Sequence, residues 1–253
     1  MPESVRAAFV AALEREIEPL VNRWERCELR AGDTSFPAFR SRGIYESGEA
    51  VLCCAGTGSA RAEQATRALL AEFGPRIVIS VGFVGAASPD LHVADVIVPS
   101  QVLIASTGER ATTAFGQGEI ATLDEVAGRE RKIQFWNSDR VLAVEMEAAG
   151  VARASNEAGL LFAAIRSVSD ELDDDTEFVA PFVRPEGFDT AGFLKFIGMR
   201  PKLWPAVARL KRNSELASTA LCKAIEEYMR GPGEFGARAN AGLLHENASA
   251  NVL

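Results

Sequence analysis

Carboxylate side chains follow two stretches of the sequence that have the composition of buried strands. Glu145 and Glu147 come directly after the apolar residues 141–144, and a second apolar run ends in Ser169 and Asp170. In α/β sheets, ligands bind at the carboxyl edge of the strands, where residues in these positions would lie. A carboxylate at that edge can accept hydrogen bonds from hydroxyl groups or transfer a proton. These four residues are therefore candidate site residues.

The first pair also has a simpler interpretation. Alanine-rich, helix-favouring residues follow Glu147 as far as Gly159, so both glutamates would stand near the start of a helix. The helix dipole favours acidic residues there even when they only face solvent. Met146, which lies between the glutamates, carries a thioether that can lie against a sugar ring. A solvated helix start and a sugar site thus remain open alternatives at this point.

Taken together, the two stretches resemble the nucleoside phosphorylase and nucleosidase superfamily. The resemblance rests on Val-Glu-Met-Glu-Ala-Ala at 144–149 and Arg-Ser-Val-Ser-Asp at 166–170, in the family's order and spacing. Within the superfamily, the sequence is similar to methylthioadenosine/S-adenosylhomocysteine nucleosidases and hopanoid-associated phosphorylases over roughly residues 5–229. The resemblance implies cleavage of the N-ribosyl bond of a purine nucleoside, with Asp170 protonating the leaving base and Glu147 holding the ribose hydroxyls.

The same resemblance implies further substrate contacts. A glycine-containing loop after the expected strand 76–81 looks like a ligand loop of the family. A later strand resembles the one that, in nucleosidases, ends near a phenylalanine stacked on the purine, and valine occupies that position here. Another ring would then have to replace the missing phenylalanine. The substrate-binding residues implied in this way are Glu147, Met146, Glu145, Ser169, Gly82, Phe83 as the replacement ring, and Val126 as the valine.

The attacking group in this family is either water or phosphate, and the sequence offers residues for both. A family glutamate at the first strand-to-helix junction activates water, and Glu16 matches it, with Glu14 and Glu18 as competitors. Phosphate needs positive charge and N–H donors. The candidate phosphate-binding residues follow a glycine-rich turn and are Gly58, Ser59 and Arg61. We favour hydrolysis because Glu16 matches its family position residue by residue, whereas Arg61 is only nearby.

Composition narrows the classes of partner. The 253 residues include 27 Lys and Arg against 35 Asp and Glu, a net charge of -8 that argues against nucleic-acid binding. The 4 cysteines lack metal-ligand spacing, and we expect reduced thiols, a cytoplasmic location and no metal. No apolar run is long enough to span a bilayer. We expect a small-molecule nucleoside as ligand, no cofactor apart from phosphate as a candidate co-substrate, and, by resemblance, a homodimer.

Strand-like and helical stretches alternate along the chain. This alternation predicts a three-layer α/β/α sandwich with a mixed, largely parallel central sheet. We expect one domain over residues 1–230 and a flexible tail over 231–253, where Gly, Ala, Asn and Ser dominate. Residues 105–118 lack periodicity and predict a loop. Trp204 lies among basic residues, and packing between helices is favoured over contact with a lipid.

Two other function classes fit parts of the sequence. A non-catalytic nucleoside-binding protein could share the fold, because a fold does not fix a function. Simple binding needs no proton donor, so the presence of Asp170 together with Glu147 argues against it. A nicotinamide-dependent oxidoreductase is disfavoured because the turn at 56–59 lacks the third glycine of a dinucleotide fingerprint.

Overall fold

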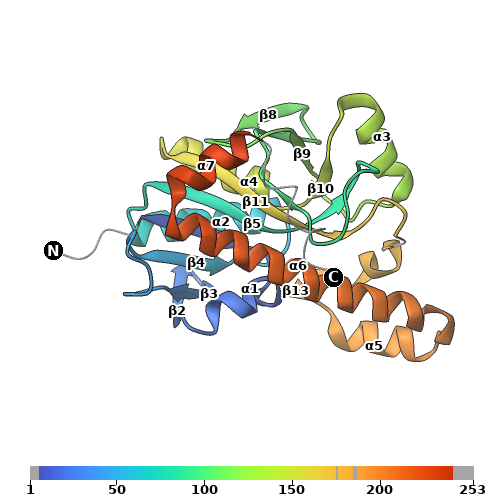
Figure 1. Ribbon diagram of the computed structural model, residues 1–253. Helices are drawn as coiled ribbons and strands as arrows, with labels where there is room; N and C mark the ends of the chain where they lie inside the picture. The colour runs from blue at the N-terminus through green and yellow to red at the C-terminus, as the bar shows by residue number, and fades with distance from the viewer. Residues whose placement is uncertain (1–5, 175, 185–186, 242–253) are drawn as a thin grey trace, which may run out of the picture.

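The structure, a computed structural model, describes residues 6–174, 176–184 and 187–241. Its main sheet has 11 strands in the order β2-β3-β4-β1-β5-β10-β9-β7-β8, and β11 pairs with both β5 and β6. A separate two-stranded sheet is formed by β12 and β13. Figure 1 shows helices on both sides of the main sheet.

The described strands differ in length, from 2 residues in β6 to 10 residues in β5 and β11. They are β1 (Ala7–Ala11), β2 (Glu25–Ala31), β3 (Thr34–Arg40), β4 (Ala50–Cys54), β5 (Ile77–Ala86), β6 (Val96–Ile97), β7 (Gln101–Ile104), β8 (Glu109–Thr112), β9 (Glu119–Thr122), β10 (Ala143–Glu145), β11 (Leu161–Asp170), β12 (Val183–Arg184) and β13 (Gly187–Phe188). The helices are α1 (Glu14–Val21), α2 (Ser59–Glu72), α3 (Arg129–Asp139), α4 (Ala148–Glu157), α5 (Thr190–Gly198), α6 (Trp204–Arg230) and α7 (Pro232–Asn240), with 3₁₀ turns η1 (Glu177–Phe182) and η2 (Pro201–Leu203).

The centre of the main sheet is parallel. Strand β1 pairs in parallel with β4 and β5, so that Phe9 lies opposite both Leu52 and Ile79, and β11 continues this arrangement on the far side of β5. Antiparallel pairs join β2, β3 and β4 at one edge and β7 and β8 at the other, and β10 and β6 also run antiparallel to β5 and β11, respectively. The prediction of a mixed sheet with parallel central strands is therefore confirmed.

Side chains alternate between the two faces of the sheet, and each face is covered by its own helices. On β1, Ala8 and Val10 pack into the core beneath α2 and α4, whereas Phe9 and Ala11 pack beneath α1, α6 and α7. Figure 1 shows α6 crossing one face of the sheet, with α7 following it. The structure thus has the three layers that the sequence predicts.

Strands β10 and β11 bring the acidic residues at their carboxyl ends to the two sides of β5, although β10 runs antiparallel to β5 and β11 runs parallel to it. Strand β11 ends at Asp170, paired with Gly85 of β5, and β10 ends at Glu145, paired with Thr122 of β9. Helix α1 begins just after β1, at the carboxyl end of that strand, and carries Glu16. Residues separated by more than 150 positions in the sequence are in this way placed around one site.

Two expectations about irregular segments are corrected by the structure. Residues 105–118, expected to form a loop, contain β8, which forms an antiparallel hairpin with β7. Trp204 does not pack in the core between helices, because 55% of it is exposed and its indole N–H donates to the carbonyl of Ile197. None of the described helices is both long enough and apolar enough to cross a bilayer.

The expected flexible tail begins instead with the packed helix α7. Phe235 of this helix is buried between the rings of Phe115 and Tyr228, with ring centroids 6.2 and 5.7 Å away. At the end of the helix, the side chain of Asn240 accepts a hydrogen bond from the N–H of Gly116. The prediction of a flexible tail was wrong for residues 232–240 because small residues such as Gly and Ala also occur in short helices that pack closely against a core. Residues 242–253 of the expected tail lie outside the described part of the chain.

We expect Phe235→Ala to lower the free energy of unfolding by about 3–5 kcal/mol, because it removes a buried ring from the core. Glu234→Ala, which truncates an exposed side chain on the same helix, should change it by less than about 0.5 kcal/mol. Urea unfolding of both variants measures the difference. Equal, small losses in the two variants would show that α7 is not part of the folded core.

Candidate active site

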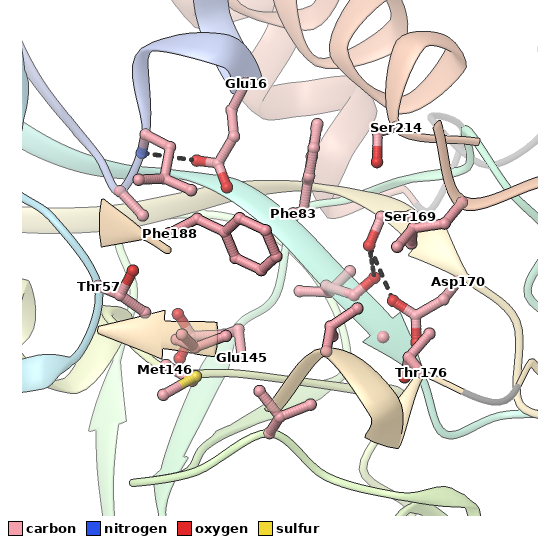
Figure 2. A pocket seen from close by; sticks show the side chains of 18 of the residues that line it. Glu16, Thr57, Phe83, Glu145, Met146, Ser169, Asp170, Thr176, Phe188 and Ser214 are labelled. Atoms are coloured by element: carbon pink, nitrogen blue, oxygen red, sulfur yellow. Dashed lines mark hydrogen bonds between the residues drawn. The ribbon is translucent and has the colours of Figure 1, made fainter. Parts of the chain in front are cut away.

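A cavity of about 710 Å³ opens at the carboxyl edge of the main sheet. Strands β5, β10 and β11 form its floor, and α1, α3, α6 and the segment around β13 form its walls. Figure 2 shows the side chains that line it. Eight of the residues expected from the sequence line this cavity, namely Glu16, Phe83, Val126, Glu145, Met146, Glu147, Ser169 and Asp170.

Glu145 is held by hydrogen-bond donors from several elements. Its Oε2 accepts from the backbone N–H groups of Glu147 (2.9 Å) and Ala148 (2.8 Å), and also from the guanidinium of Arg166. Its Oε1 accepts from the hydroxyl of Thr122. The carboxylate thereby satisfies N–H groups at the start of α4 that have no partner inside the helix. Both oxygens of Glu145 are engaged by the protein, so this residue shapes the site.

Glu147 is the buried residue directly before α4. Its Oε1 accepts a hydrogen bond from the N–H of Gly58 at 2.9 Å, which ties the glycine-rich turn to the cavity. Burial, followed by the nearby Glu145 carboxylate, raises the pKa of Glu147 to about 8, while the charge of Arg166 opposes the rise. Glu147 therefore lines the cavity with a carboxyl group that can lose or gain a proton near neutral pH.

Arg166 is fully buried and was missed as a site residue, although it belongs to the recognised motif. Its Nη2 donates to Glu145 and to the hydroxyl of Ser80. Among the residues that the structure describes, none accepts a hydrogen bond from its Nε or Nη1. Gly82 makes room for it, since a Cβ atom on Gly82 would lie 2.7 Å from Nη1 and 3.2 Å from Oε2 of Glu16. Nη1 and the Glu16 carboxyl group thus flank one point above Gly82.

Glu16 is distinguished by burial from the two glutamates beside it on α1. One of its oxygens accepts a hydrogen bond from the N–H of Leu13 at 3.3 Å, and burial raises the pKa of its carboxyl group. By contrast, Glu14 pairs with Arg26 at the surface, and the side chain of Glu18 is exposed. Glu16 and Glu18 both line the cavity, and Glu16 is the only one of the three candidates whose side chain is buried there.

Asp170 accepts hydrogen bonds on both of its carboxylate oxygens. The hydroxyl of Ser169 donates to Oδ1 at 2.8 Å, and the ammonium of Lys132 donates to Oδ2 in a salt bridge. Lys132 is only 2% exposed, and no sequence pattern distinguishes it from the other charged residues of 129–132. Helix α3 directs this one side chain inward while its neighbours face solvent.

Apolar side chains separate the two polar ends of the cavity. In Figure 2, Phe83 lies between Glu16 and the Ser169–Asp170 pair, and the ring of Phe188 extends into the cavity above Glu145 and Met146 in this view. Val126 lines the wall where the resemblance places a stacked ring. Phe188 was not identified from the sequence, because no local pattern shows that β13 folds back over the cavity. Phe83 is thus positioned to supply the ring contact that valine cannot.

The residues expected to bind phosphate are not brought to the cavity. Of the glycine-rich turn, Thr57 lines it, whereas the N–H of Gly58 is engaged by Glu147. Arg61 donates to the carbonyl of Ala55 and stacks over Phe36 at 5.1 Å. Neither Ser59 nor Arg61 is among the lining residues. The sequence places Arg61 near the start of α2 but does not show whether its side chain lies on the side of the helix that faces the cavity.

We expect the free energy of unfolding to fall as pH rises from about 4.5 to about 8, because folded Glu147 keeps a proton that the unfolded chain releases. Its stabilising contribution is complete below the unfolded pKa and is lost as pH passes the folded one. Glu147→Gln should make this decline shallower, and Glu130→Gln, at an exposed position of α3, should leave it unchanged. Thermal or urea unfolding across this range measures the slopes. Identical slopes for wild type and Glu147→Gln would contradict the assignment.

Comparison with known proteins gives a consistent result. The family model described as "Phosphorylase superfamily" matches residues 6–125 and 104–188. A 5'-methylthioadenosine/S-adenosylhomocysteine nucleosidase of Geobacillus kaustophilus is 29% identical over 202 residues, which cover 66% of this chain and 84% of the relative. The match to the family model thus spans more than half of the chain.

Solved structures show the same fold at lower sequence identity. The nucleosidase of the same name from Colwellia psychrerythraea, in complex with adenine, has a TM-score of 0.65 at 19% identity, over 89% of this chain and 95% of that one. The native futalosine hydrolase of Helicobacter pylori has a TM-score of 0.62 at 20% identity, over 88% and 98%. With the fold and the family model in agreement, the chain belongs to the phosphorylase superfamily, as its two acidic motifs predicted.

Proposed function

We propose that this protein hydrolyses the N-ribosyl bond of a purine nucleoside. The observation that carries the proposal is the pair of acids at opposite ends of one cavity, Glu16 and Asp170, with Phe83 between them. Such an arrangement can activate water on one side of a ribose and protonate the departing base on the other. The likeness to nucleosidases supports the same reaction class.

Asp170 is the proposed proton donor to the base. A departing purine carries negative charge, so protonation of a ring nitrogen in the transition state lowers the barrier. An unperturbed aspartate would be about one-thousandth protonated near neutral pH, which makes a proton source necessary. The ammonium of Lys132 is in direct contact with Oδ2 and holds the carboxyl group in place at this end of the cavity. The proton that Asp170 passes to the ring nitrogen therefore has to reach it from solvent or with the bound base.

Glu147 and Met146 are proposed to hold the ribose in the middle of the cavity. Glu147 has one oxygen engaged by Gly58 and a second that can accept from the sugar hydroxyls. Met146 lines the same part of the cavity, and its thioether can lie against the ring. Positive charge that develops on the ribose during bond cleavage would be stabilised by the neighbouring carboxylates.

The far side of the ribose favours water over phosphate as the nucleophile. Glu16 and Nη1 of Arg166 flank the point above Gly82, where a water could accept from the guanidinium and donate to the carboxylate. A phosphate dianion there would meet the carboxyl groups of Glu16, Glu145 and Glu147 with Arg166 as their buried counter-charge. Arg61, the proposed phosphate ligand, is engaged elsewhere. These contacts support hydrolysis; a cytoplasmic location and a homodimer remain predictions.

We expect Asp170→Asn to lower the rate of base release by about 10²–10⁴-fold, because the amide keeps the shape but cannot pass on a proton. Asp173→Asn alters a nearby aspartate that is 81% exposed and should retain wild-type turnover. Base release from a panel of purine nucleosides that differ at the 5′ carbon gives the rates, and circular dichroism checks the fold. Near wild-type turnover in Asp170→Asn would remove this residue from the mechanism.

We expect base release to proceed in phosphate-free buffer, to yield free ribose, and to be unaffected by added phosphate. Glu16→Gln should lower this rate by about 10²–10⁴-fold, because the amide cannot accept the proton of water. Product analysis by mass spectrometry distinguishes ribose from ribose-1-phosphate. A rate that requires phosphate and yields ribose-1-phosphate would replace hydrolysis by phosphorolysis.

A further inference from the structure

Lys132 is a buried cation beside Asp170 in the cavity. Lysine is almost never fully buried unless it is paired. Here the side chain is 2% exposed, lines the cavity and contacts Asp170 through its ammonium group. A cation in this position can bind a hydrogen-bond acceptor of a ligand.

The backbone around Lys132 is arranged to admit it. Its N–H donates to the carbonyl of Gly128 at the start of α3, which fixes the first turn of the helix. On the facing strand, a Cβ atom at Gly85 would lie 2.9 Å from both Cε and Nζ of Lys132 and 2.8 Å from Oδ2 of Asp170. Any larger residue at this position would therefore collide with the salt bridge.

The ammonium has more donors than the protein uses. It carries three N–H groups, and Asp170 is the only acceptor for them among the residues that the structure describes. Asp170 already accepts from Ser169 on its other oxygen. The base end of the cavity thus presents unused N–H donors beside the residue that protonates the base.

Purines differ in what they present to such an edge. Adenine combines the N7 acceptor with an amino group, a donor, at position 6, whereas guanine combines N7 with the O6 acceptor. Hypoxanthine shares the 6-oxo group of guanine. When N7 faces Asp170, position 6 is the neighbouring substituent on the same edge. A 6-oxo group would accept a hydrogen bond from the ammonium. A 6-amino group would instead bring its N–H groups against those of the ammonium, and the buried charge would gain no acceptor from the base.

We propose that Lys132 binds the 6-oxo group of the base, and that the protein therefore acts on 6-oxopurine nucleosides in preference to adenine nucleosides. This inference rests on the proposed function, because it uses the same cavity and the same role for Asp170. A purely structural Lys132, present only as a counter-ion for Asp170, would affect stability and the rate for all bases alike. Base preference is the property that separates the two roles.

The first test uses the wild-type protein and free bases, which do not require the unknown 5′ substituent. Isothermal titration calorimetry should show hypoxanthine binding at least about tenfold more tightly than adenine, the value of one charge-assisted hydrogen bond. Base release should show the same preference when inosine and adenosine derivatives carry the same 5′ group. Because it needs no variant, this comparison stands even if a substitution at Lys132 prevents folding.

The second test removes the cation. In Lys132→Met, the preference for hypoxanthine over adenine should fall below about threefold, mainly through weaker hypoxanthine binding. Lys132→Gln, whose amide can donate to one acceptor, should retain an intermediate preference. Arg131→Met removes a positive charge from an exposed neighbouring position of α3 and should keep the wild-type preference. Circular dichroism establishes that each variant is folded.

The outcomes separate the two proposals. Tighter binding of adenine than of hypoxanthine by wild type, or an unchanged preference in folded Lys132→Met, would overturn the proposed role of Lys132. If adenine nucleosides were still cleaved in that case, the proposed function would stand. Absence of base release from every purine nucleoside, together with no binding of either base, would overturn the proposed function and this inference with it. A preference for hypoxanthine that disappears in Lys132→Met and persists in Arg131→Met supports both.

Discussion

One fully buried guanidinium makes it possible for three carboxyl groups to share a small space. Arg166 pairs with Glu145 in the interior, where both side chains are fully inaccessible to solvent. Burial raises the pKa values of the two nearby groups, Glu16 and Glu147, and the charge of Arg166 acts against that rise. Without the cation, the carboxylates would repel one another in a region of low dielectric. The cavity thus contains one charged pair and two acids whose charge depends on their surroundings.

The two ends of the cavity differ in their balance of charge. At the end proposed to hold the base, one carboxylate and one ammonium, Asp170 and Lys132, form a pair of zero net charge. At the end proposed to hold the ribose, carboxyl groups outnumber the single guanidinium. Cleavage of an N-ribosyl bond makes the sugar more positive and the base more negative. Such an asymmetric cavity has negative groups near the sugar and hydrogen-bond donors near the base, as that redistribution of charge requires.

The sequence predicted those parts of the site that follow directly from strand ends. Glu147 and Asp170 could be found because apolar runs stop at acidic residues, and the parallel centre of the sheet follows from long buried strands. Lys132 could not be found, since its helix is charged on most sides and only tertiary packing decides which side chain turns inward. Strands β2 and β8 were missed for a related reason: both are edge strands with many exposed polar residues. Arg61 was predicted to bind phosphate because it is a cation near a glycine-rich turn, but it does not line the cavity and donates to a backbone carbonyl instead.

Glu145 joins parts of the fold that the chain forms separately. Its carboxylate receives hydrogen bonds from β9, from the start of α4 and from β11, so that Thr122, Ala148 and Arg166 are held together through one side chain. These dipoles are oriented when the protein folds, before any ligand arrives. The region proposed to bind the sugar is consequently preorganised, and the proposed reaction would need little reorientation of protein dipoles as charge develops on the ribose. The reorganisation energy of the bond-breaking step is thereby kept small by an interaction in which Glu145 itself need not touch the substrate.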